Sequence, residues 1–109
     1  MTISVGNADS QLTTTATSVA GMDATAQITL LKATVCNTDS ASHAVTVYRV
    51  PNAGTPGPTN VLIDAQSVAA GATVVLPLSG QTLINGQSLQ ALADTAGFVN
   101  LSVSWSQAT

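Results

Sequence analysis

Charged side chains are scarce in this sequence. They make up 6% of the 109 residues, whereas ~25% is typical of soluble proteins. Lys32 and Arg49 are its only cations, and its five acidic residues are all aspartates. A phosphate-binding face requires clustered lysine and arginine, and a membrane-surface helix requires a basic face. The sequence therefore predicts that neither a nucleic acid nor a membrane is a partner.

Cysteine and long apolar runs are also nearly absent. Cys36 is the single cysteine, so no disulfide can form within the chain. No apolar run approaches the ~20 residues that a membrane-spanning helix needs. Residues 1–7 carry neither a basic region nor an apolar stretch, so we expect no signal peptide and synthesis in a cytoplasm.

Aromatic residues amount to one tyrosine, one phenylalanine and one tryptophan. Sugar-binding modules stack their ligands on exposed aromatic rings, and so few rings offer little for that purpose. Trp105 belongs to an apolar stripe and is expected in the core. Tyr48 lies opposite the apolar phase of its strand, so we expect it to pack against a neighbouring strand or subunit.

What the sequence does contain is a set of short apolar stretches with the alternation of β-strands. The clearest pair is Gln27–Asn37 and His43–Val50, which are predicted to form a β-hairpin through the polar turn Thr38–Ser42. The alternation slips once, at Leu30 and Leu31. This slip predicts a β-bulge or a bend.

Turn signals divide the rest of the chain. Pro51–Asn60 holds three of the four prolines and is predicted to be a long surface loop that offers a contact surface or a mobile tip. Pro77 places the end of its strand at a sheet edge, and Asn85-Gly86 predicts a tight hairpin. A helix over Leu83–Ala93 is the alternative there. Strands are expected at Ile3–Val5, Leu12–Val19, Val61–Val68, Thr73–Leu78, Gln81–Ile84, Ser88–Asp94 and Val99–Ser106.

About seven or eight short strands predict an all-β fold, either an antiparallel β-sandwich or a jelly roll. We expect the sandwich domain to span residues 27–109. Residues 1–26 are rich in Thr, Ser and Ala, and we expect them to form an N-terminal arm that becomes ordered against a partner.

Cys36, Asp39 and His43 lie close enough in sequence to suggest a nucleophile, an orienting carboxylate and a base. All three belong to the predicted hairpin, however, and no second element supplies a pocket or an oxyanion hole. His43 is the only histidine, and the sequence contains no Gly-x-Ser-x-Gly motif. We therefore expect no catalytic residues and no enzymatic activity, with Cys36 buried and His43 exposed.

The aspartates are scattered singly, mostly beside turns, so turn capping is favoured over metal binding. The sequence has no glycine-rich phosphate loop, and we expect no cofactor and no metal. Asn100 begins a glycosylation motif but falls within a predicted strand, so we interpret the motif as coincidental. The five aspartates are Asp9, Asp23, Asp39, Asp64 and Asp94.

Five segments together resemble small virion proteins of tailed bacteriophages, and the similarity covers roughly residues 27–106. The segments are Val35–Asp39, Ala44–Tyr48, Ala69–Gly71, Leu83–Leu89 and Val99–Ser104. The resemblance implies a compact β-sandwich or jelly roll that serves as a capsid cement or decoration protein, often trimeric, or as a small tail or fibre component. It implies no enzymatic activity and transfers no site residues.

Two functions follow as expectations. The first is a structural virion protein, a capsid decoration protein that stabilises the head, binds the major capsid protein or other virion proteins, and forms a homotrimer. The second is a tail or fibre component that binds a receptor or glycan through Pro51–Asn60. Both place the protein in the virion after synthesis in the host cytoplasm.

Overall fold

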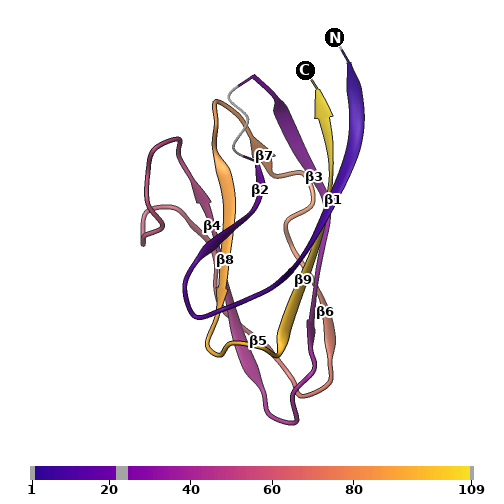
Figure 1. Ribbon diagram of the computed structural model, residues 1–109, viewed down its shortest axis with the longest axis vertical. Helices are drawn as coiled ribbons and strands as arrows, with labels where there is room; N and C mark the ends of the chain where they lie inside the picture. Colours follow the sequence, from indigo (N-terminus) through magenta and orange to yellow (C-terminus); the bar gives the residue numbers. More distant parts are fainter. Residues whose placement is uncertain (1, 22–24, 109) are drawn as a thin grey trace.

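The computed structural model describes residues 2–21 and 25–108, and over these ranges the chain forms nine β-strands and no helix that could cross a membrane. The molecule is elongated, with extents of 46 × 25 × 19 Å, and both termini lie at the same end (Figure 1). The strands are β1 (Ile3–Gln11), β2 (Thr17–Gly21), β3 (Gln27–Asn37), β4 (His43–Val50), β5 (Val61–Val68), β6 (Thr73–Leu76), β7 (Thr82–Leu83), β8 (Ser88–Ala93) and β9 (Val99–Ala108).

The strands form two antiparallel sheets. The first sheet has the order β1-β9-β3-β6, and the short β7 also pairs with β3; the second sheet has the order β2-β8-β4-β5. The expectation of an all-β antiparallel sandwich is therefore confirmed.

The strand order is that of a jelly roll. The chain behaves as one long antiparallel hairpin, in which β1 pairs with β9, β2 with β8, β3 with β6 and β7, and β4 with β5. This long hairpin folds over so that alternate segments enter opposite sheets. Its tip is the loop of residues 51–60, which lies between β4 and β5.

The core lies between the two sheets. In β4, β8 and the first half of β9, alternate residues point inward, as the period-2 pattern requires. The largest fully buried side chains of the described residues are all Leu and Val. They are Leu12, Leu30, Leu76, Leu78, Leu83, Leu89, Leu101, Val35, Val45, Val47, Val50 and Val68.

The predicted hairpin between Gln27–Asn37 and His43–Val50 is wrong in its pairing. The two arms coincide residue for residue with β3 and β4, but β3 belongs to the first sheet and β4 to the second. Both strands bury their inward-facing residues in the core between the two sheets. Residues 38–42 form a corner that connects the sheets.

Asn37 fixes this corner. Its side chain is fully buried, and its Nδ2 donates hydrogen bonds to the carbonyl oxygens of Ala41 (2.8 Å) and Val68 (3.0 Å). Its Oδ1 accepts a hydrogen bond from the backbone N–H of Asp39 at 3.0 Å. One amide therefore holds the corner in shape and joins it to the end of β5.

The slip at Leu30 and Leu31 is confirmed as a bulge, since the register between β3 and β9 shifts between Leu30 and Lys32. The turn at Asn85-Gly86 has the positive φ values expected, 56° and 79°. It does not close a hairpin, because β7 pairs within the first sheet and β8 within the second. A local turn signal gives the direction of the chain but not the sheet that the next strand joins.

The expected edge position of the strand before Pro77 and the strand after Asn85-Gly86 are confirmed, and the expected burial of Trp105 is met in part. β6, which ends just before Pro77, lies at a sheet edge. The Leu83–Ala93 region contains a strand, β8, and not a helix. Trp105 is only partly buried, although it packs against the core.

The first 26 residues contribute two strands to the sandwich. β1 pairs with β9 over nine residues, and β2 pairs with β8. Leu12, expected inside a strand, instead follows β1 and is fully buried. Strands on both sides of residue 26 thus pair with one another, and ordering of this segment by a partner stays a prediction.

Candidate assembly surface

The side of the first sheet that faces away from the core is here called the outer face. Leu101 and Val103 are buried, so the residues that alternate with them on β9 point outward. Residues directly opposite on paired antiparallel strands share a face, and the register therefore identifies the outward residues of the other strands. The outer face comprises Ile3, Val5, Asn7, Asp9 and Gln11 of β1, Asn100, Ser102, Ser104, Ser106 and Ala108 of β9, Thr29, Lys32, Thr34 and Cys36 of β3, and Thr73 and Val75 of β6.

Short hydroxyl and amide side chains cover most of the outer face, and apolar side chains lie at its margins. Ile3 and Val5 on β1 are 67% and 73% exposed, and Val75 on β6, at the other edge, is 60% exposed. The Ser102 hydroxyl donates a 2.6 Å hydrogen bond to Asp9 Oδ1. Such a face offers hydrogen bonds and apolar contacts over a broad area with little electrostatic steering.

A second feature is a histidine held between two carboxylates. His43 Nε2 lies 2.7 Å from Asp39 Oδ2, and Nδ1 lies 2.9 Å from Asp94 Oδ1. The ring stacks on Phe98 with centroids 6.1 Å apart. The hydrogen bond that the protonated His43 ring donates to Asp39 is the main cause that raises the pKa of His43, and the same bond lowers the pKa of Asp39. The cluster joins the β3–β4 corner to the β8–β9 turn.

The expectation of an exposed His43 is wrong, because only 13% of its side chain is accessible. Both of its ring nitrogens are engaged by carboxylates, so neither is left for a thiol. Cys36 is half-buried on β3, opposite Asn100 and Thr73, and not fully buried as expected. The structure therefore brings Asp39 and His43 together and leaves Cys36 apart from them. It also adds Asp94, which no local sequence pattern connects with His43.

Two of the four described aspartates, Asp39 and Asp94, act as hydrogen-bond acceptors near chain reversals, whereas Asp9 and Asp64 lie within strands. Asp39 Oδ1 also accepts the backbone N–H of Ser40 at 2.7 Å, as turn capping requires. Among residues 2–21 and 25–108 no three potential ligands are grouped to hold a metal ion. Asp39 and Asp94 engage opposite sides of the His43 ring, so the three cannot converge on one ion. Asp64 is exposed, and Asp23 lies outside the described residues.

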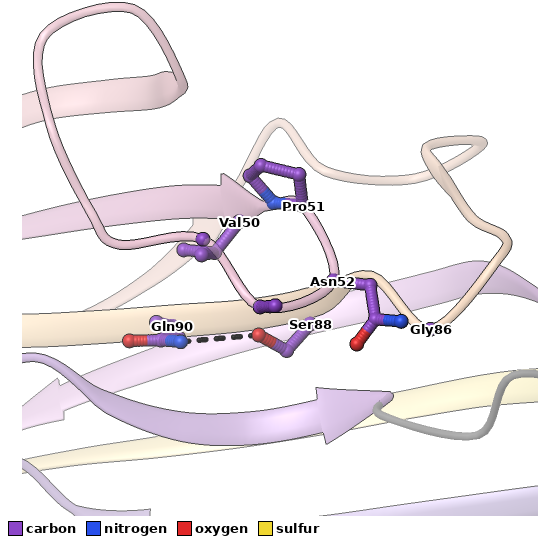
Figure 2. A pocket seen from close by; sticks show the side chains of 8 residues that line it. Val50, Pro51, Asn52, Gly86, Ser88 and Gln90 are labelled. Carbon is purple, nitrogen blue, oxygen red and sulfur yellow. Dashed lines mark hydrogen bonds between the residues drawn. The ribbon is translucent and has the colours of Figure 1, made fainter.

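The loop of residues 51–60 folds back over the second sheet and leaves a shallow hollow of about 230 Å³. Figure 2 shows Asn52 beside Gly86, with the hydrogen bond from Gln90 to Ser88 on the floor. The lining is of mixed polarity and comprises Val50, Pro51, Asn52, Ala53, Gly54, Gly86, Ser88 and Gln90. The hollow has the size for a small polar group and holds no charged side chain.

A second hollow of about 260 Å³ lies at the other side of this loop and is lined by Tyr48, Gly57, Pro58, Val61 and Asp64. Asn60 braces the loop, since its Oδ1 accepts the N–H of Gly57 (3.0 Å) and its Nδ2 donates to Thr55 O (2.9 Å). Tyr48 is half-buried and borders both its strand neighbour Val61 and the loop. The predicted surface loop is confirmed; its use as a contact surface stays a prediction.

No protein-family model matches this chain, and no curated protein sequence matches it. Solved structures do share its fold. A chain of the Bacillus endospore appendages, described as a family of disulfide-linked pili, has a TM-score of 0.52 at 14% identity and covers 97% of this chain and 84% of its own length.

Two further structures come from viruses. A chain of infectious bursal disease virus, Gx strain, has a TM-score of 0.50 at 15% identity over 97% of this chain, which spans only 31% of that viral chain. A chain of the cyanophage Pam1 capsid asymmetric unit has a TM-score of 0.47 at 13% identity, over 96% of this chain and 83% of that one. For the endospore appendage chain and the bursal disease virus chain, whose TM-scores are 0.52 and 0.50, the similarity establishes a shared fold and nothing further.

Proposed function

We propose that this protein is a structural subunit of a virus particle, and specifically a decoration protein that binds the outside of a tailed-phage capsid. The outer face carries this proposal, because it presents a broad, almost uncharged sheet surface with exposed apolar residues at both edges. The fold shared with a chain of infectious bursal disease virus and the resemblance to phage virion proteins support it. The proposal assigns the chain no catalytic role.

The chemistry of the outer face defines how attachment would work. With one lysine and one aspartate on it, binding to the major capsid protein would rely on buried area and hydrogen bonds, and not on charge pairs. Exposed charges are also screened beyond ~8 Å at physiological salt. A homotrimer, as the resemblance implies, would present three such faces, and multivalency of this kind raises avidity by roughly 10²–10⁴.

Binding to purified capsids of the source phage tests this proposal. We expect saturable binding whose affinity changes little between ~50 mM and ~500 mM salt, because few ion pairs would form between the outer face and the capsid. Val75→Asp places a charge on the outer face and should weaken binding about tenfold or more, because a buried unpaired charge is costly.

The matched control is Ser67→Asp, which adds the same charge at an exposed position of β5 in the second sheet. It should leave capsid binding unchanged. A steep fall of affinity with salt, or equal losses in the two variants, would contradict attachment through the outer face.

The hollow beneath residues 51–54 favours a second candidate, a tail or fibre component that binds a receptor or glycan. Its polar groups, Asn52, Ser88 and Gln90, would recognise a sugar through hydrogen bonds. Screening of the isolated protein on a glycan array tests this function. Specific binding that Gln90→Ala abolishes would support it, and an array without a hit, together with capsid binding, would leave the decoration role.

A further inference from the structure

Five strands lie at the edges of the two sheets: β1 on one side of the first sheet, β6 and the two-residue β7 on its other side, and β2 and β5 in the second sheet. Edge strands expose unpaired backbone N–H and C=O groups, and proteins normally block them with bulges, prolines or short length. β6 has four residues and is followed by Pro77. β2 has five residues and a register shift between Ser18 and Ala20. β5 has two register shifts and a positive φ of 51° at Ala65.

β1 has none of these protections. It pairs with β9 through nine consecutive residues without a register shift, and it contains no proline and a single charge, Asp9. Ile3 and Val5 are the two most exposed large apolar side chains on the described surface. A long, regular edge with exposed apolar side chains at its start is a ready template for pairing with another strand.

A close packing contact also joins β1 to β9. A Cβ at Gly6 would lie 2.7 Å from the indole of Trp105, so the Trp105 ring packs directly over the glycine backbone. A large aromatic ring that covers an edge glycine stabilises the register of that strand. This packing limits the conformations open to β1, which lowers the entropy cost of pairing.

We infer that β1 pairs along its free edge with β1 of a second copy of this chain, antiparallel, so that the first sheets of two copies join into one continuous sheet. Among the strands that the structure describes, the other edge strands are short, bulged or followed by proline. In a second copy, β1 is therefore the one unblocked edge strand with which β1 can pair. Pairing of β1 with β1 is isologous, and the two-fold axis closes the contact.

The register follows from overlap and charge. Full overlap of the nine residues places Asn7 opposite Asn7 of the second copy, Val5 opposite Asp9, and Ile3 opposite Gln11. The two Asp9 carboxylates are then kept apart. One strand pair buries less than the ~1,000 Å² of a stable specific interface, so the contact is weak alone and joins copies already held close. It links subunits in pairs, and a trimer would use other surfaces.

Disulfide trapping of the protein alone tests this inference, independently of capsid attachment. In a Cys36→Ser background, Asn7→Cys places two thiols across the two-fold axis. Opposite residues of an antiparallel pair have Cα atoms ~4.5–5.5 Å apart, within the ~4.4–6.8 Å that disulfides span. Under mild oxidation we expect a covalent dimer. The control is Ser67→Cys on the blocked edge strand β5, which should crosslink much more slowly.

Charge variants at Val5 test the register. Val5→Asp faces Asp9 of the second copy and should slow crosslinking of the Asn7→Cys protein, whereas Val5→Lys should accelerate it. With two symmetric pairs of about 0.5 kcal/mol each, the two variants should differ from the parent about fivefold in opposite directions. Equal rates for the charge variants, or an Asn7→Cys rate no higher than that of Ser67→Cys, would overturn the proposal.

Discussion

Replacement of Asn37 should destabilise the protein far more than replacement of any exposed asparagine. Its side chain makes three short hydrogen bonds, to Ala41 O, to Val68 O and from Asp39 N–H. Each contributes about 1 kcal/mol net to stability. Asn37→Ala should therefore lower the free energy of unfolding by about 3 kcal/mol, a large part of the ~5–15 kcal/mol that stabilises a typical domain.

Asn37→Asp sharpens this test because it keeps the shape of the side chain and changes one atom. The new oxygen would face the carbonyl oxygens of Ala41 and Val68, to which the amide nitrogen now donates. A buried charge without a donor is costlier than a missing bond. At neutral pH this variant should be less stable than Asn37→Ala, and acidification should recover part of the loss by protonating the carboxyl.

Urea denaturation followed by circular dichroism measures both variants, and the midpoint should fall while the slope stays constant. Asn100→Asp is the control, since Asn100 is exposed on β9. A loss below about 1 kcal/mol for Asn37→Ala, or an Asn37→Asp protein as stable as Asn100→Asp, would refute the role of Asn37 in the corner.

Three further outcomes are expected. Because its bond to Asp39 raises the pKa of His43 above the ordinary 6.5, the folded protein binds this proton more tightly than the unfolded chain. The stabilisation is thus complete below pH 6.5 and is lost as the pH rises through the raised pKa. The difference in melting temperature between the natural protein and His43→Gln should therefore shrink as the pH rises over this window. NMR titration of the His43 ring should give a midpoint above 6.5. Gly6→Val should displace the Trp105 ring and change its fluorescence, with a stability loss of about 1–3 kcal/mol, whereas Gly57→Val, in open space, should not. Cys36→Ser replaces a half-buried thiol of the outer face by a hydroxyl of similar size and should change capsid binding little; a large loss would show that the thiol itself contributes to attachment.

Local pattern was sufficient for several strands, but not for the bounds of β1 and β2. Alternating apolar residues identified β3 and β4 with their bounds, because a half-buried strand must place every second side chain in the core. The slip at Leu30 and Leu31 marked a bulge for the same reason. Asn85-Gly86 marked a turn because its backbone needs positive φ at both residues.

The candidate sites were less accessible to sequence reasoning. The sequence suggests Asp39 and His43 as a pair because they are only four residues apart. Asp94 and Phe98 complete the cluster from a turn that is distant in sequence. The outer face was also missed as a unit. Its polar alternation is visible in β9, yet β1, which supplies Ile3 and Val5, was expected to lie in a separate arm.

The sequence by itself determined that the chain forms short antiparallel strands with an apolar face, few charges and a prolonged loop at residues 51–60. Only the tertiary structure decided which sheet each strand joins. Alternation records that one side of a strand is buried, but not which strand covers it. β3 and β4 are neighbours in sequence and lie in opposite sheets, whereas β1 and β9 pair from the two ends of the chain. Long-range packing across the core selects these partners, and the buried amide of Asn37 turns the chain from one sheet to the other.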